Sequence, residues 1–465
     1  MSDRSKDASI PNDDPPFKSK VNKQGEVDTP VPVVKTSYPL LLVYAALFGA
    51  GAALLTAAYI TVYNWGVKFF EQPSHFGLTI GRFWPLILLS VGGLLLGLAI
   101  KFTGQRGGLG VAQREYSEAG RINPRNLPSI MLEAMITLWS GAAVGPEGPL
   151  VFLTGGVGSW CADRLKLAKD DVPLLVYCAI AGAFGGFLGS PIIGAVGAIE
   201  YMFIHELNYY RHAIPGLLAA SFGWGIYFAL LHTSFMGIYS FPNYASPRIV
   251  DLGWALLIGV IAGVIGTVYK VIFGVVHLVF APLKQLPVIR AVVGGILIGL
   301  IGSFLPLALY SGQNQLLEII HNPAAYGVGL LLLLLLAKAL LTSTSYATGF
   351  DGGPIFPLLF IGGTLGLAIS QVFPFIPQGV GVTTGMAGIA SAVFPIPLTV
   401  ALLLGLMGGQ TDLTPVITIG AVIGFLTAKA LAPLLPKPKP TSTESSASEA
   451  KSPATSATAN TDETN

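Results

Sequence analysis

Long, almost uncharged apolar blocks constrain the fold of this chain more than any other feature. The plainest are Leu40–Tyr63, Trp84–Phe102, Trp254–Ile272, Ala291–Leu309 and Ala325–Leu341. A helix needs roughly twenty apolar residues to cross the hydrocarbon core of a bilayer, and these blocks approach or exceed that length. Charged residues make up only 11% of the 465, whereas a soluble protein carries about 25%. The sequence therefore predicts an all-α integral membrane protein that crosses the bilayer many times.

The two ends of the chain differ from this apolar body. Residues 1–38 are polar and charged, which predicts a disordered leader, and residues 435–465 are mostly Ser, Thr, Ala and Glu, which predicts a disordered low-complexity tail. Lysine and arginine concentrate in the short cytoplasmic loops of membrane proteins. They gather in the leader and again after the second apolar block (Lys101, Arg106, Arg114, Arg121 and Arg125). Because two spans separate these regions, we expect both of them, and both chain ends, on the cytoplasmic side.

Apolar segments beyond residue 127 are interrupted by glycine and proline, and glycine supplies 57 of the 465 residues. In a bilayer, unpaired backbone groups at such breaks are tolerated only where protein or a water-filled path surrounds them. The interrupted segments also repeat: residues 148–158 resemble 353–366, and 179–202 resemble 386–407 with a proline at an equivalent turn. Chance similarity among glycine-rich stretches is the alternative. Paired breaks are typical of inverted-repeat transporters with a midplane site, so we expect one membrane domain, 39–434, with inverted halves at about 39–235 and 250–434.

The first motif is Gly145-Pro-Glu-Gly-Pro149, in which a carboxylate stands at the predicted start of an apolar helix. Free N–H groups and the positive end of the helix dipole favour an anion at such a position. Glu147 can be that anion, or it can move aside and leave the place to a mobile one. The alternative is that Glu147 only caps its own helix. An ionisable residue this deep in apolar sequence is a functional candidate by default.

Two further glycine-rich segments border apolar stretches. Gly352-Gly-Pro-Ile-Phe-Pro357 precedes the apolar residues 358–369, and Gly107-Gly-Leu-Gly-Val-Ala112 follows the second span at its basic end. Each motif is weak when taken alone. Together with the first, they aim three sets of backbone amides, from distant parts of the chain, at what could be a single site.

With these motifs in this order, the sequence resembles the CLC family of chloride channels and chloride/proton antiporters. Gly145–Pro149 is similar to the family's GREGP motif, with Pro146 in place of arginine. Gly352–Pro357 is similar to its GGIFAP motif, and Gly108–Ala112 falls where the family has GSGIP. The resemblance covers roughly residues 40–434 and is to the compact bacterial type, so the expected architecture is a multi-helix CLC-like fold with inverted repeats and broken helices.

The resemblance implies CLC-type transport of chloride or a similar small anion through a pore lined by backbone amides. It also implies a homodimer in the lipid bilayer, with a pore in each subunit. Glu147 matches the family's gating glutamate. The implied anion-binding residues are Glu147 and Gly148 at an outer site, Ile355 and Phe356 at a central site, and Gly108, Leu109 and Gly110 at the inner mouth. Amide dipoles suit this task because they bind an ion that can still leave.

Three of the family's donors to the anion are missing or replaced. Leu109 stands where the family has a serine, and Pro354 replaces a residue that would offer an amide. Residues 417–434 contain no match for the family's tyrosine in the last helix. The sequence therefore leaves the preferred anion open.

The family's inner proton-transfer glutamate aligns with Tyr201, next to Glu200. A tyrosine with an ordinary pKa of about 10 exchanges protons poorly at neutral pH, and adjacent helical residues point about 100° apart. Glu200 and Tyr201 are the proton-path candidates; for Glu200 the alternative is a structural carboxylate bonded to backbone. We expect a channel-like or weakly proton-coupled carrier, with a fully coupled chloride/proton antiporter as the alternative.

Other functions fit the sequence less well. The histidines show no metal-ligand spacing, and no nucleotide-binding loop or nucleophile motif is present, so we expect no metal, cofactor, nucleic-acid partner or enzyme activity. A sodium-coupled solute symporter would need cation ligands and an organic substrate pocket, and Glu147 beside helix N-termini argues against it. The remaining charged residues of apolar segments are interpreted as interhelix partners or caps (Glu133, Asp163, Asp351, Asp412 and Lys338).

Overall fold

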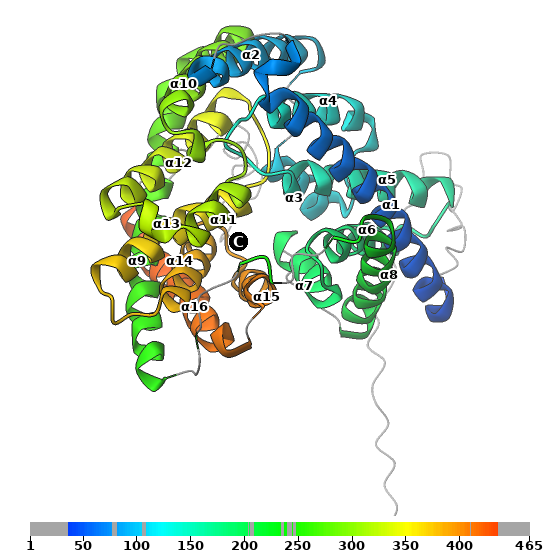
Figure 1. Cartoon of the computed structure of the whole chain (residues 1–465). Helices are drawn as coiled ribbons and strands as arrows, with labels where there is room; N and C mark the ends of the chain where they lie inside the picture. The colour runs from blue at the N-terminus through cyan, green and yellow to red at the C-terminus, as the bar shows by residue number, and fades with distance from the viewer. Residues whose placement is uncertain are drawn as a thin grey trace, which may run out of the picture.

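The computed structural model describes residues 36–76, 81–104, 108–202, 204, 209–233, 237–239, 244, 248–409 and 411–435. The predicted leader and tail lie almost wholly outside these residues. Within the described part, the regular structure is helical, and an isolated bridge between Gly145 and Gly353 is the extended pairing. The helices are α1 Tyr38–Glu71, α2 Trp84–Thr103, α3 Leu109–Ala119, α4 Leu127–Trp139, α5 Glu147–Arg164, α6 Val172–Phe187, α7 Pro191–Tyr201, α8 Ile214–Leu231, α9 Ile249–Phe280, α10 Pro287–Phe304, α11 Gln313–His321, α12 Val328–Thr348, α13 Ile355–Val372, α14 Gln378–Val393, α15 Pro397–Gly408 and α16 Thr414–Leu431 (Figure 1).

Eight of the described helices are long and apolar enough to cross a membrane: α1, α2, α8, α9, α10, α12, α13 and α16. The five predicted blocks fall in α1, α2, α9, α10 and α12, which confirms the multi-span prediction. The block predicted to run to Leu309 is too long, because α10 ends at Phe304. Pro306 explains that end, since proline disfavours a helical residue before it. Large apolar side chains cover the outer surfaces, as on Leu47 and Val275, and lipid rather than water suits them.

The helices pack in two sets that repeat one pattern. In the first set, α1 packs on α6 and α8; in the second, α9 packs on α14 and α16. The contacts α2–α4, α4–α5, α5–α6 and α6–α7 recur as α10–α12, α12–α13, α13–α14 and α14–α15. Figure 1 shows α6, α7 and α8 gathered on one side of the molecule and α13, α14, α15 and α16 on the other. The two sets meet where α7 contacts α15. The sequence repeat therefore reflects a structural repeat and not chance similarity.

The equivalent helices α2 and α10 show that the two halves are inverted. They pack side by side through glycines that admit close backbone contact (Figure 1). A side chain at Gly97, near the end of α2, would collide with Val288 at the start of α10. A side chain at Gly299, near the end of α10, would collide with Leu86 at the start of α2. The two helices therefore run in opposite directions, which confirms the predicted inverted architecture; the limits of each half stay a prediction.

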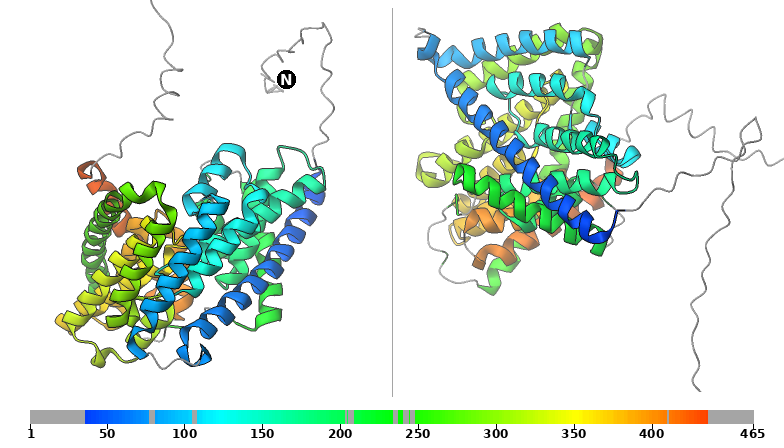
Figure 2. Two further views of the ribbon diagram at one scale, coloured as in Figure 1. Left: turned by 90° about the horizontal axis from the view of Figure 1, so that it is seen from above. Right: turned by 90° about the vertical axis from the view of Figure 1, so that its right-hand side faces the viewer.

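The helix directions also define two sides of the molecule. The Trp84 side chain donates to the carbonyl of Phe70 at 2.8 Å, so the end of α1 meets the start of α2. We call the opposite side, where α1 begins, the leader side. The end of α2, the end of α9 and the start of α10 all lie there, because α2 and α10 are antiparallel and only residues 281–286 join α9 to α10. Figure 2 shows these long helices crossing the body of the molecule from one side to the other.

Candidate functional site

The loops that precede α5 and α13 are paired with each other. The Gly145 N–H donates to the Gly353 carbonyl at 2.8 Å, and the Gly353 N–H donates to the Gly145 carbonyl at 2.6 Å. Each loop belongs to a different half, and each leads directly into the first turn of its helix. The pairing therefore brings two helix N-termini together inside the molecule, where unsatisfied N–H groups and helix dipoles favour negative charge.

The carboxylate of Glu147 lies between these two N-termini. Glu147 is the first residue of α5 and is 0% exposed. Its Oε1 accepts a hydrogen bond from the Ile355 N–H at 2.7 Å, and the backbone amides of Glu147 and Phe356 also interact with the carboxylate. Its Oε2 has no hydrogen-bond partner among the described residues. A Cβ atom on Gly353 would overlap the carboxyl carbon, so this loop needs glycine to admit the carboxylate.

Tyrosines from neighbouring helices hold both loops in place. The Tyr59 hydroxyl of α1 donates to the Pro146 carbonyl at 3.0 Å. The Tyr346 hydroxyl of α12 donates to the Gly352 carbonyl at 2.9 Å. The equivalent loops of the two halves are thus each fixed by one hydroxyl–carbonyl bond, and the amides of the following turn remain directed at the site.

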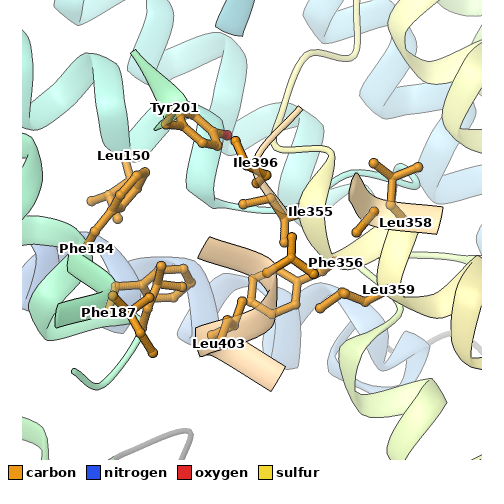
Figure 3. Packing of buried hydrophobic residues seen from close by; sticks show 14 of the residues in the cluster. Leu150, Phe184, Phe187, Tyr201, Ile355, Phe356, Leu358, Leu359, Ile396 and Leu403 are labelled. Carbon is orange, nitrogen blue, oxygen red and sulfur yellow. The ribbon is translucent and has the colours of Figure 1, made fainter. Parts of the chain in front are cut away.

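Apolar side chains enclose the site beside the carboxylate. Phe356, in the first turn of α13, packs edge-to-face against Phe187 of α6 with ring centroids 6.1 Å apart. Figure 3 shows these two rings with Leu403 of α15 next to them, and Tyr201 and Ile396 at the other end of the cluster. This packing excludes water around the amides and so strengthens electrostatic interactions there.

Two cavities approach the site from opposite sides. One cavity, with a volume of about 590 Å³, lies on the side opposite the leader side, and we call it the far-side vestibule. It is lined by the second half of α1, the end of α8 and the start of α11, and it reaches Pro146. The leader-side vestibule, about 760 Å³, is lined by the end of α9, the start of α10 and the end of α12, and it reaches Gly108 and Pro354. The Glu147 carboxylate and the Phe187–Phe356 contact lie between them. The paired loops thus lie between a cavity that reaches Pro146 and a cavity that reaches Gly108 and Pro354.

Comparison with known proteins identifies the family. The family described as voltage gated chloride channel matches residues 92–429 of the chain. The chain belongs to this family, CLC. The protein YfeO of Salmonella choleraesuis (strain SC-B67), whose name describes ion transport, is 26% identical over 363 residues, covering 76% of this chain and 86% of YfeO. The chain is therefore a CLC-type anion transport protein of the membrane and not an enzyme.

Solved CLC structures show the same fold. The structure of a slow cyanobacterial chloride/proton antiporter matches with a TM-score of 0.74 at 20% identity, over 85% of this chain and 96% of that one. The structure of a CLC-type fluoride/proton antiporter matches with a TM-score of 0.71 at 22% identity, over 85% of this chain and 97% of that one. Identity this low establishes the shared architecture alone.

The structure brings most of the predicted CLC site residues together. Glu147 and Gly148 open α5, and Ile355 and Phe356 open α13, so all four lie at the paired N-termini. Gly108 and Gly110 line the leader-side vestibule at the start of α3. Leu109 is the first residue of α3, but its side chain, like Gly107, lies outside the described part of the chain. Gly108 and Gly110 thus lie at the leader-side vestibule and not at the Glu147 carboxylate.

Glu200 and Tyr201 have different surroundings from each other. Glu200 Oε1 accepts from the Leu398 N–H at 3.1 Å, and its Oε2 accepts from the N–H and the hydroxyl of Thr399 at 2.7 and 2.6 Å. These are the bonds of a structural carboxylate that caps α15. The Tyr201 ring packs on Phe394 with centroids 5.1 Å apart, and its hydroxyl has no hydrogen-bond partner among the described residues.

Sequence reasoning missed the pairing of the two loops and the two tyrosines that hold them. The Gly145–Gly353 pairing could not be predicted, because neither loop has a local sequence pattern that specifies which loop it pairs with. Tyr59 and Tyr346 lie in apolar helices without a motif, so they carried no local signal. Lys338 was interpreted as an interhelix partner, and its Nζ indeed donates to the carbonyls of residues 308, 309 and 310 at 3.1, 3.1 and 2.6 Å. Lys338 thereby fixes residues 308–310, which precede Gln313 in the chain. Gln313 lines the far-side vestibule.

Proposed function

We propose that this chain passes chloride or a similar small anion through the site between α5 and α13, with Glu147 as the gate. The hydrogen bond from the Ile355 N–H to the Glu147 carboxylate is the observation that carries the proposal. A carboxylate that accepts this amide occupies the place that a mobile anion would need. When it is protonated or displaced, the amides of α13 become available to the anion.

The donors of the site are suited to an anion that passes through rather than to one that is bound permanently. The described donors at the carboxylate are backbone amides, which bear partial charges, and not lysine or arginine side chains. Partial charges and helix dipoles bind an anion in a water-excluded site without holding it permanently. The vestibules on either side would supply and remove hydrated ions. The proposed anion-binding residues are Gly148, Ile355 and Phe356 at the closed site, and Gly108, Leu109 and Gly110 at its leader-side mouth.

We infer that proton coupling is weak or absent. Each carboxylate oxygen of Glu200 accepts from the N-terminal turn of α15, and this bonding suits a cap better than a proton carrier. Tyr201 is a phenol in an apolar enclosure. The alternative is a fully coupled antiporter, which is favoured by one observation: two solved structures with this fold are proton antiporters, one for chloride and one for fluoride.

Orientation and assembly remain proposals from the sequence and the family resemblance. We propose that the leader side faces the cytoplasm, because the basic leader and the basic stretch from Lys101 to Arg125 both adjoin it. On this view both chain ends are cytoplasmic and 39–434 form the membrane domain. The expected assembly is a homodimer with one passage in each subunit.

Flux in liposomes tests the proposed function. Purified full-length protein should release chloride or fluoride from liposomes without sodium and without ATP, and a pH electrode in the same chamber should record little or no accompanying proton movement. Protein-free liposomes are the control. A sodium requirement, or the absence of flux for every small anion tried, would show that the proposal is wrong. Proton movement in fixed proportion to the anion would favour the coupled antiporter.

A further inference from the structure

Helix α12 carries a row of polar side chains along one face. Lys338, Thr342, Ser345 and Tyr346 follow one another at helical spacing, which places them on the same side of the helix. Thr342 donates to the Ala143 carbonyl at 3.0 Å, and the Ser345 hydroxyl accepts from the Ala143 N–H at 3.3 Å. Tyr346 bonds to the loop before α13. Three members of the row therefore hold the loops of the site, and the fourth, Lys338, brings an amino group into the membrane domain.

The surroundings of the Lys338 amino group match a charged ammonium. Its Nζ is 3.1, 3.1 and 2.6 Å from the carbonyl oxygens of residues 308, 309 and 310. An ammonium has three N–H donors, one for each carbonyl, whereas a neutral amine has two and would direct its lone pair at the third oxygen. The Phe360 ring, with its centroid 5.3 Å from Nζ, adds a favourable contact for a cation. Lys338 is 0% exposed, so this positive charge is fully buried.

No carboxylate of the described residues forms an ion pair with Lys338. Its acceptors are carbonyl oxygens, which bear partial charges and so bind the ammonium without cancelling its charge. Water and salt screen a buried charge less than an exposed one. The electrostatic field of Lys338 therefore extends beyond its hydrogen-bond partners.

The ammonium lies directly behind the wall of the far-side vestibule. Ser311 and Gln313 line this cavity, and Gly312 lies between them in the chain. A Cβ atom on Gly312 would be 3.1 Å from Lys338 Nζ. A single residue thus separates the buried charge from the cavity.

Charges of both signs act on the far-side vestibule. Tyr63, in its lining, interacts electrostatically with Glu147 and with Glu71 at the end of α1. An ionised carboxylate repels an anion that approaches through this cavity. Lys68, the one charged side chain in the described lining, is exposed, so solvent screens its charge. Lys338 is therefore the positive charge best placed to offset the repulsion.

We propose that Lys338 is a specificity-determining residue: its buried ammonium makes the far-side vestibule positive, which draws small inorganic anions to this mouth and repels cations. The proposal rests on the proposed function, because it concerns entry into the same passage from the far side. Lys338 does not contact the anion. It acts through its field, which raises the local concentration of anions at the mouth.

Chloride flux into liposomes at a series of chloride concentrations tests the proposal. Lys338→Gln keeps two N–H donors for the carbonyls but removes the charge. The chloride concentration that gives half-maximal flux should rise about threefold to tenfold, as expected for the loss of one attractive charge beside a water-filled cavity. The maximal rate should change less, because the amide site is intact. Lys338→Arg keeps the charge and should stay close to the wild type.

A purely positioning role for Lys338 predicts the reverse split. The glutamine variant would then keep the half-maximal concentration of the wild type, and its maximal rate or its thermal stability in detergent would fall. The matched control is Lys429→Gln, which removes an exposed lysine of α16 that does not line this vestibule. It should change neither the half-maximal concentration nor the maximal rate.

A variant of the opposite sign keeps the proposal testable if no variant of Lys338 folds. Asn314 is exposed and lines the far-side vestibule two residues after Gly312. The carboxylate of Asn314→Asp should oppose the ammonium and raise the half-maximal chloride concentration, whereas Asn314→Ser should not. An unchanged value in Asn314→Asp, or in folded Lys338→Gln protein that still carries chloride, would overturn the inference. Absence of anion flux from the wild-type protein would instead contradict the proposed function.

Discussion

The two halves of the molecule share one helical pattern, but they contribute different chemistry to its centre. Helix α5 of the first half begins with Glu147, whereas its counterpart α13 begins with Ile355. The first half therefore supplies a charge and the second half supplies the amide that binds it. The repeated fold gives two facing N-termini, and because only α5 begins with a carboxylate, the Glu147 side chain of the first half occupies an amide of the second.

A second carboxylate of the first half also binds a helix N-terminus of the second half. Glu200, at the end of α7 in the first half, accepts from the first turn of α15 in the second half. The position equivalent to Glu200, counted from the prolines that open α7 and α15, is Leu406. Carboxylates of the first half thus bind helix N-termini of the second at two depths. We propose that Glu147 is a gate and that Glu200 is a structural cap.

The largest effect should come from removing the first-half charge. Glu147→Gln keeps the size of the side chain but removes its ionisation, so the amides of α13 lose their internal competitor. Flux in the wild type should rise as the pH falls, because protonation neutralises the carboxylate. In the variant, flux should be nearly the same across roughly pH 4 to 8, a window around and above an ordinary glutamate pKa. Chloride efflux from liposomes at a series of pH values measures this.

A purely structural Glu147 predicts a different pattern. Yield or thermal stability in detergent would fall, and the remaining flux would keep the pH profile of the wild type. Well-folded Glu147→Gln protein with an unchanged profile would remove the gate from this residue.

The next effect concerns the glycine that admits the carboxylate. The Cβ atom of Gly353→Ala would overlap the Glu147 carboxyl carbon, so the carboxylate should be displaced and flux at neutral pH should increase. The two changes should couple, because the residues are in contact. In a Glu147→Ala background, Gly353→Ala should have little further effect on flux. The four proteins of this double-mutant cycle are compared at pH 7.5.

The control for this cycle is Gly362→Ala, which places a methyl group against α14 and away from the carboxylate. It should reduce stability without coupling to Glu147. Equal effects of Gly353→Ala in both backgrounds would show that the carboxylate does not occupy the observed position during transport.

A smaller effect is expected at the second carboxylate. Glu200→Ala removes the cap from α15 and should lower the free energy of unfolding by about 0.5–2 kcal/mol, the usual value of a helix cap. Thr399→Val removes one of the three bonds and should cost less. Thermal stability in detergent ranks the two variants. The pH profile of flux should not move in either; a changed profile or altered proton movement would return Glu200 to a proton path.

The comparison of the halves also shows how far the sequence could lead. Apolar length predicts α1, α2, α9, α10 and α12, because a span in lipid must be helical. Paired glycine–proline breaks predict the positions of α5 and α13, since a broken helix has to end at a site. Lys270, His277 and Lys284 line the leader-side vestibule and recur at intervals of seven, a spacing that places helical residues on nearly one face. Motif order predicts Glu147 beside Ile355, but no local pattern predicts the pairing of Gly145 with Gly353.

Long-range partners set the roles that the sequence left open. Glu200 had two interpretations of similar weight, and the choice depends on where the first turn of α15 lies, which is a property of the packed halves. Asp351 follows a helix in an otherwise apolar sequence, and its neighbours Gly108 and Arg290 are far from it along the chain. Such contacts arise from helix packing, which local composition does not specify.

The smallest effect sharpens the comparison at the mouth of the passage. Leu109 opens α3 where the CLC motif has a serine, so the leader-side mouth lacks one hydroxyl donor. Leu109→Ser should add one hydrogen bond to a bound anion, about 0.5–1.5 kcal/mol net, which tightens binding severalfold in calorimetry. Leu109→Ala is the matched control, because it shortens the side chain without adding a donor. Equal affinities of the serine and alanine variants would place residue 109 away from the ion, and the alignment of this loop with the family motif would be wrong. A gain specific to serine would show that the first half, which carries the proposed gate Glu147, also sets how tightly the leader-side mouth binds the anion.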